Sequence, residues 1–337
     1  MKRRLNIFDA GVAFVMAFVI AQITAVIGTS ISQVIMDICG MSETSIANFW
    51  DTAYGYLLQA IFMNIAFVLV FIWCYKKRDM KPVLTKPNKS TTKYMYICIA
   101  LGIASLFLLS GVLNYFQLFV NKLGYDSSTL SYELNSPAKY LISLVSLALI
   151  PAICEELLFR GILTTALKEK GQIFAIVVSS IMFSIFHFSP SQLIYPICFG
   201  LILSIVYLRT KNIIFPILLH FINNALTISI QYFSEPTTTT FIHSNSMLIY
   251  TIITFGIWVT AIYYLFKDFV KHNLKPASNT NKLENQNLSL ENASENENLN
   301  QTSIQNPKDI QEQKLNHAVL YGSIALMLLV YILLLFV

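Results

Sequence analysis

The stretch 147-LALIPAICEELLFRGIL-163 combines the apolar character of a membrane-embedded helix with three charged side chains. Charged groups at membrane depth are costly, so they are usually paired or functional. On a helix, Glu156 and Arg160 are four residues apart and share one face, where they can form an ion pair. Glu155 points about 100° away from Glu156 and does not share that partner equally. Its carboxylate is therefore the first candidate for chemistry.

Pro151 lies one turn before this acidic pair. Proline has no backbone N–H, so it leaves the carbonyl of Leu147 without its usual helical partner and can bend the helix. Broken helical hydrogen bonding at membrane depth is tolerated only where protein or a water-filled cavity covers it. The stretch is therefore expected to face a polar interior rather than lipid.

The rest of the chain has the composition of a membrane protein. Of its 337 residues, 55% are hydrophobic and only 12% are charged, and the mean hydropathy is +0.60. Soluble domains have about twice that charged fraction. The five cysteines are scattered through apolar segments with no CxxC pair, which argues against a disulfide framework or a zinc cluster. The net charge of +5 bears on membrane topology, and no nucleic-acid partner is expected.

The apolar segments predict an all-α fold, a polytopic membrane helix bundle with eight core spans plus a ninth C-terminal span after a disordered linker. The nine candidates are 7–36, 53–75, 94–121, 137–168, 172–188, 191–208, 212–233, 247–266 and 318–337.

Lysine and arginine predict the orientation of these spans. Positive residues collect at the N-terminus and at every second turn thereafter, whereas the intervening turns are poor in them. Because positive residues favour the cytoplasmic side, the N-terminus is expected in the cytoplasm. The chain is expected to be an integral, multi-pass membrane protein.

Residues 273–316 differ from the rest of the chain. Eleven asparagines stand there among Glu, Gln, Ser and Lys, with almost no aromatic residues. Such a segment cannot bury enough apolar surface to offset the entropy of ordering. We expect a bundle over 1–272 with its motif core at 137–233, a disordered cytoplasmic linker over 273–316, and a terminal helix, 317–337, that need not belong to the functional core.

Two other apolar segments carry polar side chains that are expected to lie near Glu155. At about 1.5 Å per residue, Glu155 lies about 20 Å from the inner end of its helix, and His187 lies at a similar depth, about 24 Å along its helix from Gly171. His220 and Asn224 are four residues apart and share one helix face. These four polar groups can meet in one interior layer.

One Glu, two His and one Asn suit amide hydrolysis. A carboxylate can act as the general base for water beside a histidine, and a histidine with an amide N–H can stabilise an oxyanion. Alternatively, Glu155, His187 and His220 could be three ligands of a catalytic Zn²⁺ with an open water position. Both interpretations predict a protease, and the sequence leaves both open.

Three motifs together resemble the CAAX protease and bacteriocin-processing family of intramembrane proteases, also called the Abi family. They are Glu155-Glu156-x-x-x-Arg160, Phe183-x-x-x-His187 and His220-x-x-x-Asn224, and they span about 137–233. The resemblance implies an α-helical core with a catalytic cavity open to the cytoplasm. It implies Glu155 and His187 as activators of water, His220 and Asn224 as oxyanion donors, and a structural role for Glu156 and Arg160.

The resemblance also implies a substrate class, a membrane-associated protein or peptide cleaved near its C-terminus within the lipid bilayer. Eukaryotic members of the family remove a C-terminal tripeptide from prenylated proteins. Bacterial members are linked to peptide export, bacteriocin immunity or membrane-protein maturation. A non-catalytic immunity or adaptor protein that keeps the fold is the alternative, although such a protein has no need for all four polar positions. A transporter is a weaker alternative, since we find no internal repeat.

Overall fold

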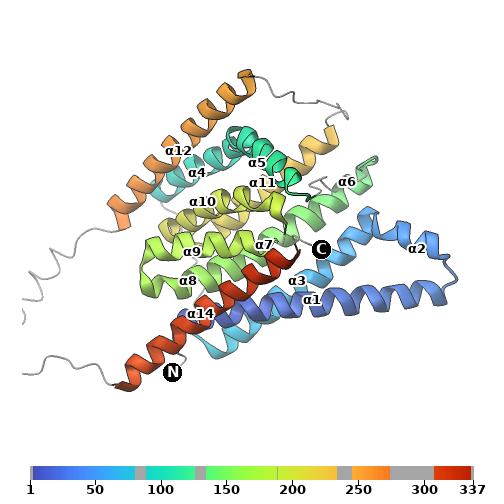
Figure 1. The fold of residues 1–337 in the computed structure, drawn as a ribbon, viewed down its shortest axis with the longest axis horizontal. Coiled ribbons are helices and arrows are strands. Elements are labelled where there is room, and N and C mark those ends of the chain that lie inside the picture. Colours follow the sequence, from blue (N-terminus) through green and yellow to red (C-terminus); the bar gives the residue numbers. More distant parts are fainter. Residues whose placement is uncertain are drawn as a thin grey trace, which may run out of the picture.

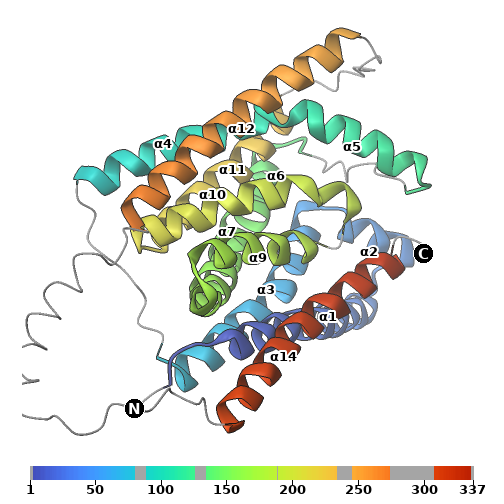
Figure 2. The same ribbon diagram turned by 60° about the vertical axis from the view of Figure 1, so that its left-hand side comes forward.

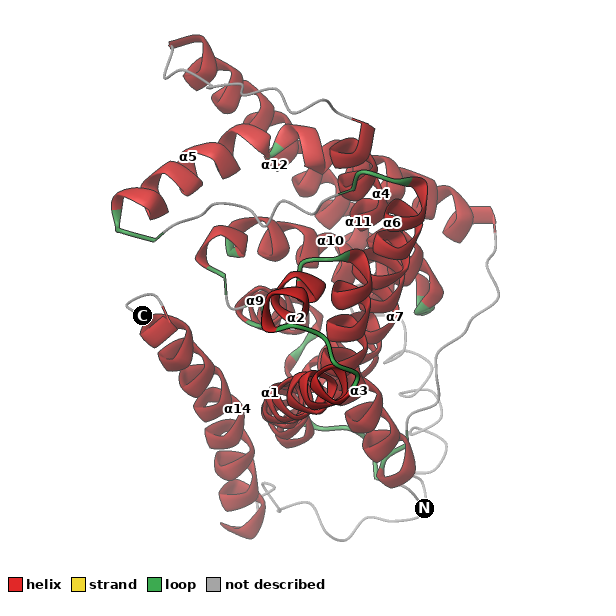
Figure 3. Cartoon of the chain, turned by 90° about the vertical axis from the view of Figure 1, so that its right-hand side faces the viewer, coloured by secondary structure: helices red, strands yellow, loops and turns green. Residues whose placement is uncertain are grey.

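A computed structural model describes residues 3–79, 89–125, 134–187, 189–233, 245–273 and 307–334. Figure 3 shows that the described chain is helical and contains no strand. The first five helices are α1 (Ile7–Ile38), α2 (Glu43–Trp50), α3 (Ala53–Lys77), α4 (Lys89–Leu108) and α5 (Ser110–Lys122). The last five are α9 (Gln172–Ile185), α10 (Ile194–Thr210), α11 (Ile214–Phe233), α12 (Asn245–Asn273) and α14 (Pro307–Leu334), and a short 3₁₀ turn, η4 (Pro190–Gln192), precedes α10.

Between these groups lies one long helical rod that carries the acidic motif. It consists of α6 (Pro137–Ser143), the π-helical turn η1 (Leu144–Leu149), α7 (Ile150–Glu156), the π-helical η2 (Leu157–Thr164), α8 (Thr165–Leu167) and a final 3₁₀ turn, η3 (Lys168–Lys170). The rod begins where Ser136 accepts a hydrogen bond from the backbone N–H of Lys139, with Pro137 in the first turn.

The predicted membrane-bundle class is confirmed, but the predicted number of spans is not. Six helices in the described part of the chain are long and apolar enough to cross a membrane: Ile7–Ile38, Ala53–Lys77, Pro137–Lys170, Pro190–Thr210, Ile214–Phe233 and Leu248–Lys271. Predicted span 94–121 is a pair of helices, α4 and α5, bent by 45°, which makes a seventh if the two are counted as one.

One of the nine predicted spans needs correction, and another is described only in part. Predicted span 172–188 is the 14-residue helix α9, which is about 21 Å long and falls short of a bilayer core of about 30 Å. Predicted span 318–337 lies on α14, but its last residues, 335–337, fall outside the described part of the chain, so this span stays a prediction.

The rod lies in the middle of the bundle, and α9, α10 and α11 pack around it (Figures 1 and 2). α1 and α3 cover one side of it, whereas α4 and α12 lie together beyond α10 (Figure 2). One hydrophobic cluster joins α1, α3, the rod and α9, and a second joins α10, α11 and α12. The acidic motif therefore lies between two apolar layers.

The beginning of α1 is tied to the ends of α3 and the rod. Asp9 is fully buried and accepts hydrogen bonds from Arg78, with Nη2–Oδ1 at 2.7 Å and Nε–Oδ1 at 2.9 Å. This contact raises the pKa of Arg78 above its ordinary value. Glu169 accepts a hydrogen bond from the backbone N–H of Ile7 at 3.2 Å, which satisfies one of the free N–H groups of the first turn. Three positively charged helix ends therefore lie on the same side of the molecule.

The C-terminal helix differs from its prediction in extent and in packing. α14 begins at Pro307, so residues 307–316 are helical rather than part of the predicted linker; residues 274–306 lie outside the described part. α14 lies along α1 (Figures 1 and 2). Its Leu320 and Met327 are fully buried in the cluster that contains Leu158 and Phe159 of the rod. α14 therefore packs on the helical bundle through α1, while its part in the function stays a prediction.

Gly11 makes the contact between α1 and α14 possible. A Cβ atom at Gly11 would lie 3.0 Å from the Cα of Leu320 and 3.1 Å from its backbone nitrogen, both of them backbone atoms that cannot turn aside. We expect Gly11→Val to force the two helices apart and to destabilise the protein by about 1–3 kcal/mol. Thermal unfolding in detergent measures this loss.

Gly322→Val is the matched control, because a Cβ atom at Gly322 of α14 meets nothing within 4 Å. It should unfold at nearly the temperature of the unmodified protein. Equal unfolding temperatures for Gly11→Val and Gly322→Val would contradict close packing of α14 on α1.

Candidate active site

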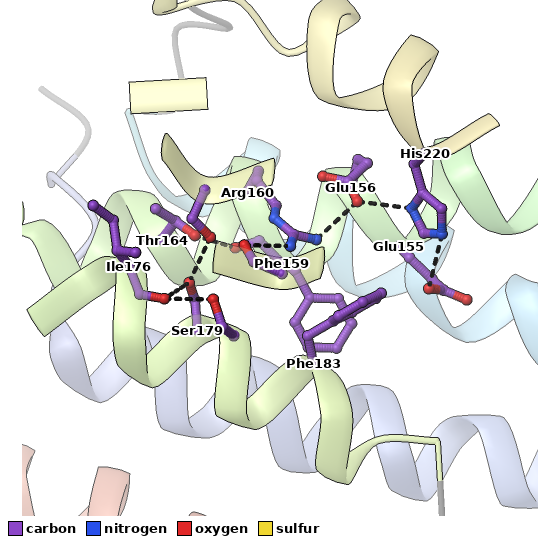
Figure 4. A network of polar contacts seen from close by, with 12 residues as sticks. Glu155, Glu156, Phe159, Arg160, Thr164, Ile176, Ser179, Phe183 and His220 are labelled. Atoms are coloured by element: carbon purple, nitrogen blue, oxygen red, sulfur yellow. Dashed lines mark hydrogen bonds and ion pairs between the residues drawn. The ribbon is translucent and has the colours of Figure 1, made fainter. Parts of the chain in front are cut away.

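The ion pair expected from the spacing of Glu156 and Arg160 is present and fully buried. Arg160 Nη1 donates to Glu156 Oε1 at 2.8 Å, and both side chains are 0% exposed. Arg160 Nη2 donates to the carbonyl of Gly200 at 3.2 Å, and its guanidinium lies 4.8 Å from the ring centroid of Phe183. The cation is thus enclosed by a carboxylate, a carbonyl and an aromatic face (Figure 4).

Close packing of α9 and α10 brings the carbonyl of Gly200 to Arg160. A Cβ atom at Gly200 would lie 3.0 Å from the Cβ of Ser180, so glycine lets the two helices approach. Ser179 and Ser204 bond across the same seam, with their Oγ atoms 3.1 Å apart. The small residues at 200 and 204, four apart in the sequence, therefore set a helix contact that ends at the buried arginine.

Glu155 turns away from this ion pair and toward α11. Its Oε2 lies 4.0 Å from Nε2 of His220, and its side chain is 19% exposed. Within the described part of the protein, Oε2 is buried and has no hydrogen-bond partner. An acceptor left open beside a histidine is suited to binding a water molecule.

His220 is held by Glu156 rather than by Glu155. Its Nδ1 lies 2.8 Å from Glu156 Oε1, the same oxygen that accepts from Arg160 (Figure 4). An ionised carboxylate can only accept, so Nδ1 carries the hydrogen and Nε2 faces Glu155. The second glutamate therefore fixes the orientation of the imidazole, a contact that the sequence reasoning did not predict.

His187 lies just beyond the end of α9, in the turn that follows Ile185. Its Nδ1 is 2.9 Å from the carbonyl of Phe183. Because a carbonyl only accepts, Nδ1 donates, and in the neutral ring Nε2 is left as an acceptor. No hydrogen bond or ion pair among the described residues joins His187 to Glu155.

Phe183 connects the two histidines. Its ring lies edge-to-face with His187 at 5.0 Å between centroids and with His220 at 5.7 Å. The same ring covers Arg160, so one side chain contacts three polar groups of the site. The i, i+4 spacing of Phe183 and His187 signals their contact, but nothing in the sequence signals the contact with His220.

Asn224 reaches the rod at the carbonyl that proline leaves free. Its Nδ2 donates to Leu147 at 3.3 Å. Pro151, four residues after Leu147, has no N–H to offer that carbonyl. Asn224 therefore lies one turn from His220 on α11 and contacts the helix that carries Glu155.

Three of the four predicted polar residues therefore lie at one helix contact, and the fourth, His187, is connected to it only through an aromatic ring. Glu155, His220 and Asn224 meet where α7 and η1 face α11, and His187 joins them through Phe183. Sequence reasoning missed the bond of Glu156 to His220 and the participation of Asn223 and Tyr195 behind Asn224.

The predicted zinc alternative does not fit this arrangement. No group of three or more His, Cys, Asp or Glu side chains among the described residues is placed to hold a metal ion. We therefore derive no step through a metal ion.

Comparison with known proteins agrees with the three motifs. Residues 137–226 match the family described as type II CAAX prenyl endopeptidase Rce1-like. This segment is therefore similar to the catalytic domain of that family. The predicted resemblance is confirmed for the part of the chain that carries Glu155, His187, His220 and Asn224.

A relative in Bacillus subtilis (strain 168) supports the same assignment. The protein named "Putative membrane peptidase YdiL" is 24% identical over 176 residues, which are 51% of this chain and 72% of that protein. No solved structure gave a significant match. The matched segment thus extends from the first residue of the rod, Pro137, into α11, and it includes residues from every helix that contributes to the site.

Proposed function

We propose that this protein is an intramembrane endopeptidase that hydrolyses a peptide bond near the C-terminus of a membrane-associated protein or peptide. The observation that carries the proposal is the open acceptor of Glu155, which faces His220 at 4.0 Å, while Asn224 of the same helix as His220 contacts the rod at Leu147. The Rce1-like domain and the relative named as a membrane peptidase support this reaction class.

In the proposed mechanism, Glu155 and His187 activate a water molecule. Glu155 accepts a proton from the water, and the acceptor nitrogen of His187 orients it. The oxygen attacks the scissile carbonyl and forms a tetrahedral intermediate with a negative oxygen. Glu155 then delivers its proton to the amide nitrogen, the C–N bond breaks, and an amine and a carboxylic acid leave. No covalent enzyme intermediate is required.

The negative oxygen is stabilised from α11. Asn224 carries two hydrogens on Nδ2; one goes to Leu147, and the other is available to the oxyanion. His220 in its protonated form donates from Nε2, while Nδ1 stays bonded to Glu156. In this proposal, the base comes from α7 and the oxyanion donors from α11, and the scissile bond lies between these two helices.

We also propose the orientation of the protein in a bacterial plasma membrane, with the N-terminus in the cytoplasm. The contacts between the start of α1, the end of α3 and the end of the rod support it, because these ends carry many of the lysines and arginines and lie on one side. The proposal requires a path from that side by which water and the C-terminal segment of a substrate reach Glu155.

Cleavage of a defined substrate tests the proposal. The purified protein in lipid vesicles should release a fragment from the C-terminus of a membrane-bound peptide, and mass spectrometry identifies the bond. A farnesylated peptide and its unmodified counterpart determine whether a prenyl group is needed.

His187→Ala should lower the cleavage rate about 100-fold, because the water loses its second contact. His317→Ala is the matched control: His317 stacks on Tyr321 of α14 and should be replaceable with full activity. Equal rates for the two variants would remove His187 from the mechanism.

Removal of metal ions is expected to leave cleavage intact, because no three-ligand group is formed by the described residues. Elemental analysis of chelator-washed protein, together with its cleavage rate, measures this. Stoichiometric zinc, with activity that disappears on chelation and returns with the ion, would favour the metal mechanism instead.

A further inference from the structure

The carbonyl of Leu147 determines which way the amide of Asn224 points. A carbonyl oxygen can only accept a hydrogen bond, so Asn224 must present its NH₂ group there, as the 3.3 Å contact has it. The reversed amide would place Oδ1 against another oxygen in the membrane interior, where repulsion between acceptors is poorly screened. The orientation of Asn224 therefore follows from its partner.

The same logic continues to the next side chain. With Nδ2 of Asn224 toward Leu147, its Oδ1 faces the other way and accepts from Nδ2 of Asn223 at 3.3 Å. Asn223 then has its own Oδ1 left, and the hydroxyl of Tyr195 donates to that oxygen. Each link has one donor and one acceptor, so the direction of the whole chain is fixed from Leu147 back to Tyr195.

The surroundings of this hydrogen-bonded chain, called the relay below, favour a rigid arrangement. Asn223 is only 4% exposed, so water does not compete for its amide. The ring of Tyr195 stacks on Phe199 at 5.9 Å and 15° between planes, and Phe199 in turn packs against His220. Tyr195 comes from α10, whereas Asn223 and Asn224 are neighbours on α11, so the relay also couples two helices.

We infer that Tyr195 and Asn223 are positioning residues that hold Asn224 with its free N–H directed at the reacting carbonyl. The inference rests on the proposed function, in which that N–H binds the oxyanion. Neither residue belongs to the three motifs. They act before substrate arrives, because an amide that is already oriented does not reorganise in the transition state.

Kinetics with conservative variants test the inference. Tyr195→Phe keeps the ring and its stacking but removes the donor; it should lower kcat about fivefold with KM nearly unchanged. Asn223→Asp keeps the shape but, when ionised, offers only acceptors to Asn224; it should lower kcat about 30-fold or more. In an Asn224→Ala background neither change should lower kcat further, since the group they position is gone.

A purely structural role gives a different pattern. The losses would then multiply with that of Asn224→Ala, and would follow the unfolding temperature of each variant. Either result would overturn the inference. Inactivity of the unmodified protein on every substrate tried would refute the proposed function instead, so a readout without substrate is needed as well.

Side-chain amide NMR supplies that readout. In protein labelled with ¹⁵N-asparagine, the NH₂ signals of Asn224 are assigned from their loss in Asn224→Asp. We expect Tyr195→Phe to shift these signals, whereas Phe116→Leu, a ring change in α5 that takes no part in the relay, should leave them in place. Asn224 signals that are insensitive to Tyr195→Phe would refute the relay, whether or not cleavage is observed.

Discussion

Glu155→Gln should abolish peptide cleavage while the protein remains folded in the membrane. Glutamine has nearly the same shape, but it cannot accept a proton from water at neutral pH, so the general base is lost. We expect the rate to fall about 10³-fold or more. A cleavage assay in vesicles measures the rate, and thermal unfolding compares the folded states. Because Glu155 Oε2 lacks a hydrogen-bond partner among the described residues, its replacement by a neutral group should cost little stability.

Glu43→Gln is the control for this variant. Glu43 is an exposed acid in the first turn of α2 and takes no part in the site. It should retain full cleavage activity. Full activity of Glu155→Gln as well would end the assignment of Glu155 as the base. Loss of activity together with loss of folded protein would show that Glu155 supports the fold instead.

Local spacing in the sequence was sufficient to predict part of this site. The i, i+4 rule places Arg160 on Glu156, and Pro151 leaves the carbonyl of Leu147 open; the ion pair is present, and that carbonyl is used. These features depend only on helix geometry within one segment. Hydropathy likewise predicts a membrane bundle, because each span must bury its own backbone hydrogen bonds.

Contacts between side chains of different helices could not be predicted from the sequence. Which glutamate bonds to His220 depends on the rotation of α11 against α7, and no local rule fixes that angle. The depth estimates treated Glu155 and His187 as neighbours, yet α9 ends before His187, and no hydrogen bond or ion pair among the described residues joins the two side chains. The close approach of α14 to Gly11 joins residues about 310 positions apart, and nothing near Gly11 in the sequence signals it.

The buried triad of Glu156, Arg160 and His220 carries the second large expected effect. Arg160→Met should leave the Glu156 carboxylate in the interior with only His220 as a partner, and Glu156→Gln should leave a fully buried guanidinium without its counter-charge. Removal of one partner of a buried ion pair typically destabilises by about 3–5 kcal/mol. We therefore expect each single variant to accumulate poorly and to unfold at a lower temperature, as measured by size-exclusion chromatography and thermal unfolding in detergent.

Arg209→Met is the matched control for the arginine change. The ion pair of Arg209 with Asp268 is longer, 3.9 Å, and the Asp268 side chain is 40% exposed. Such pairs are worth about 0–1 kcal/mol, so this variant should accumulate normally. Normal accumulation of Arg160→Met would mean that the buried pair does not sustain the fold.

The double variant Glu156→Gln/Arg160→Met separates stability from activity. With both charges gone, no uncompensated ion remains, and much of the lost stability should return. Activity should not return with it, because His220 Nδ1 then faces a neutral amide instead of the carboxylate that orients its ring and balances the charge of its protonated form. A folded double variant with unimpaired cleavage would show that Glu156 serves the ion pair alone and that the orientation of His220 comes from the aromatic rings of Phe183 and Phe199.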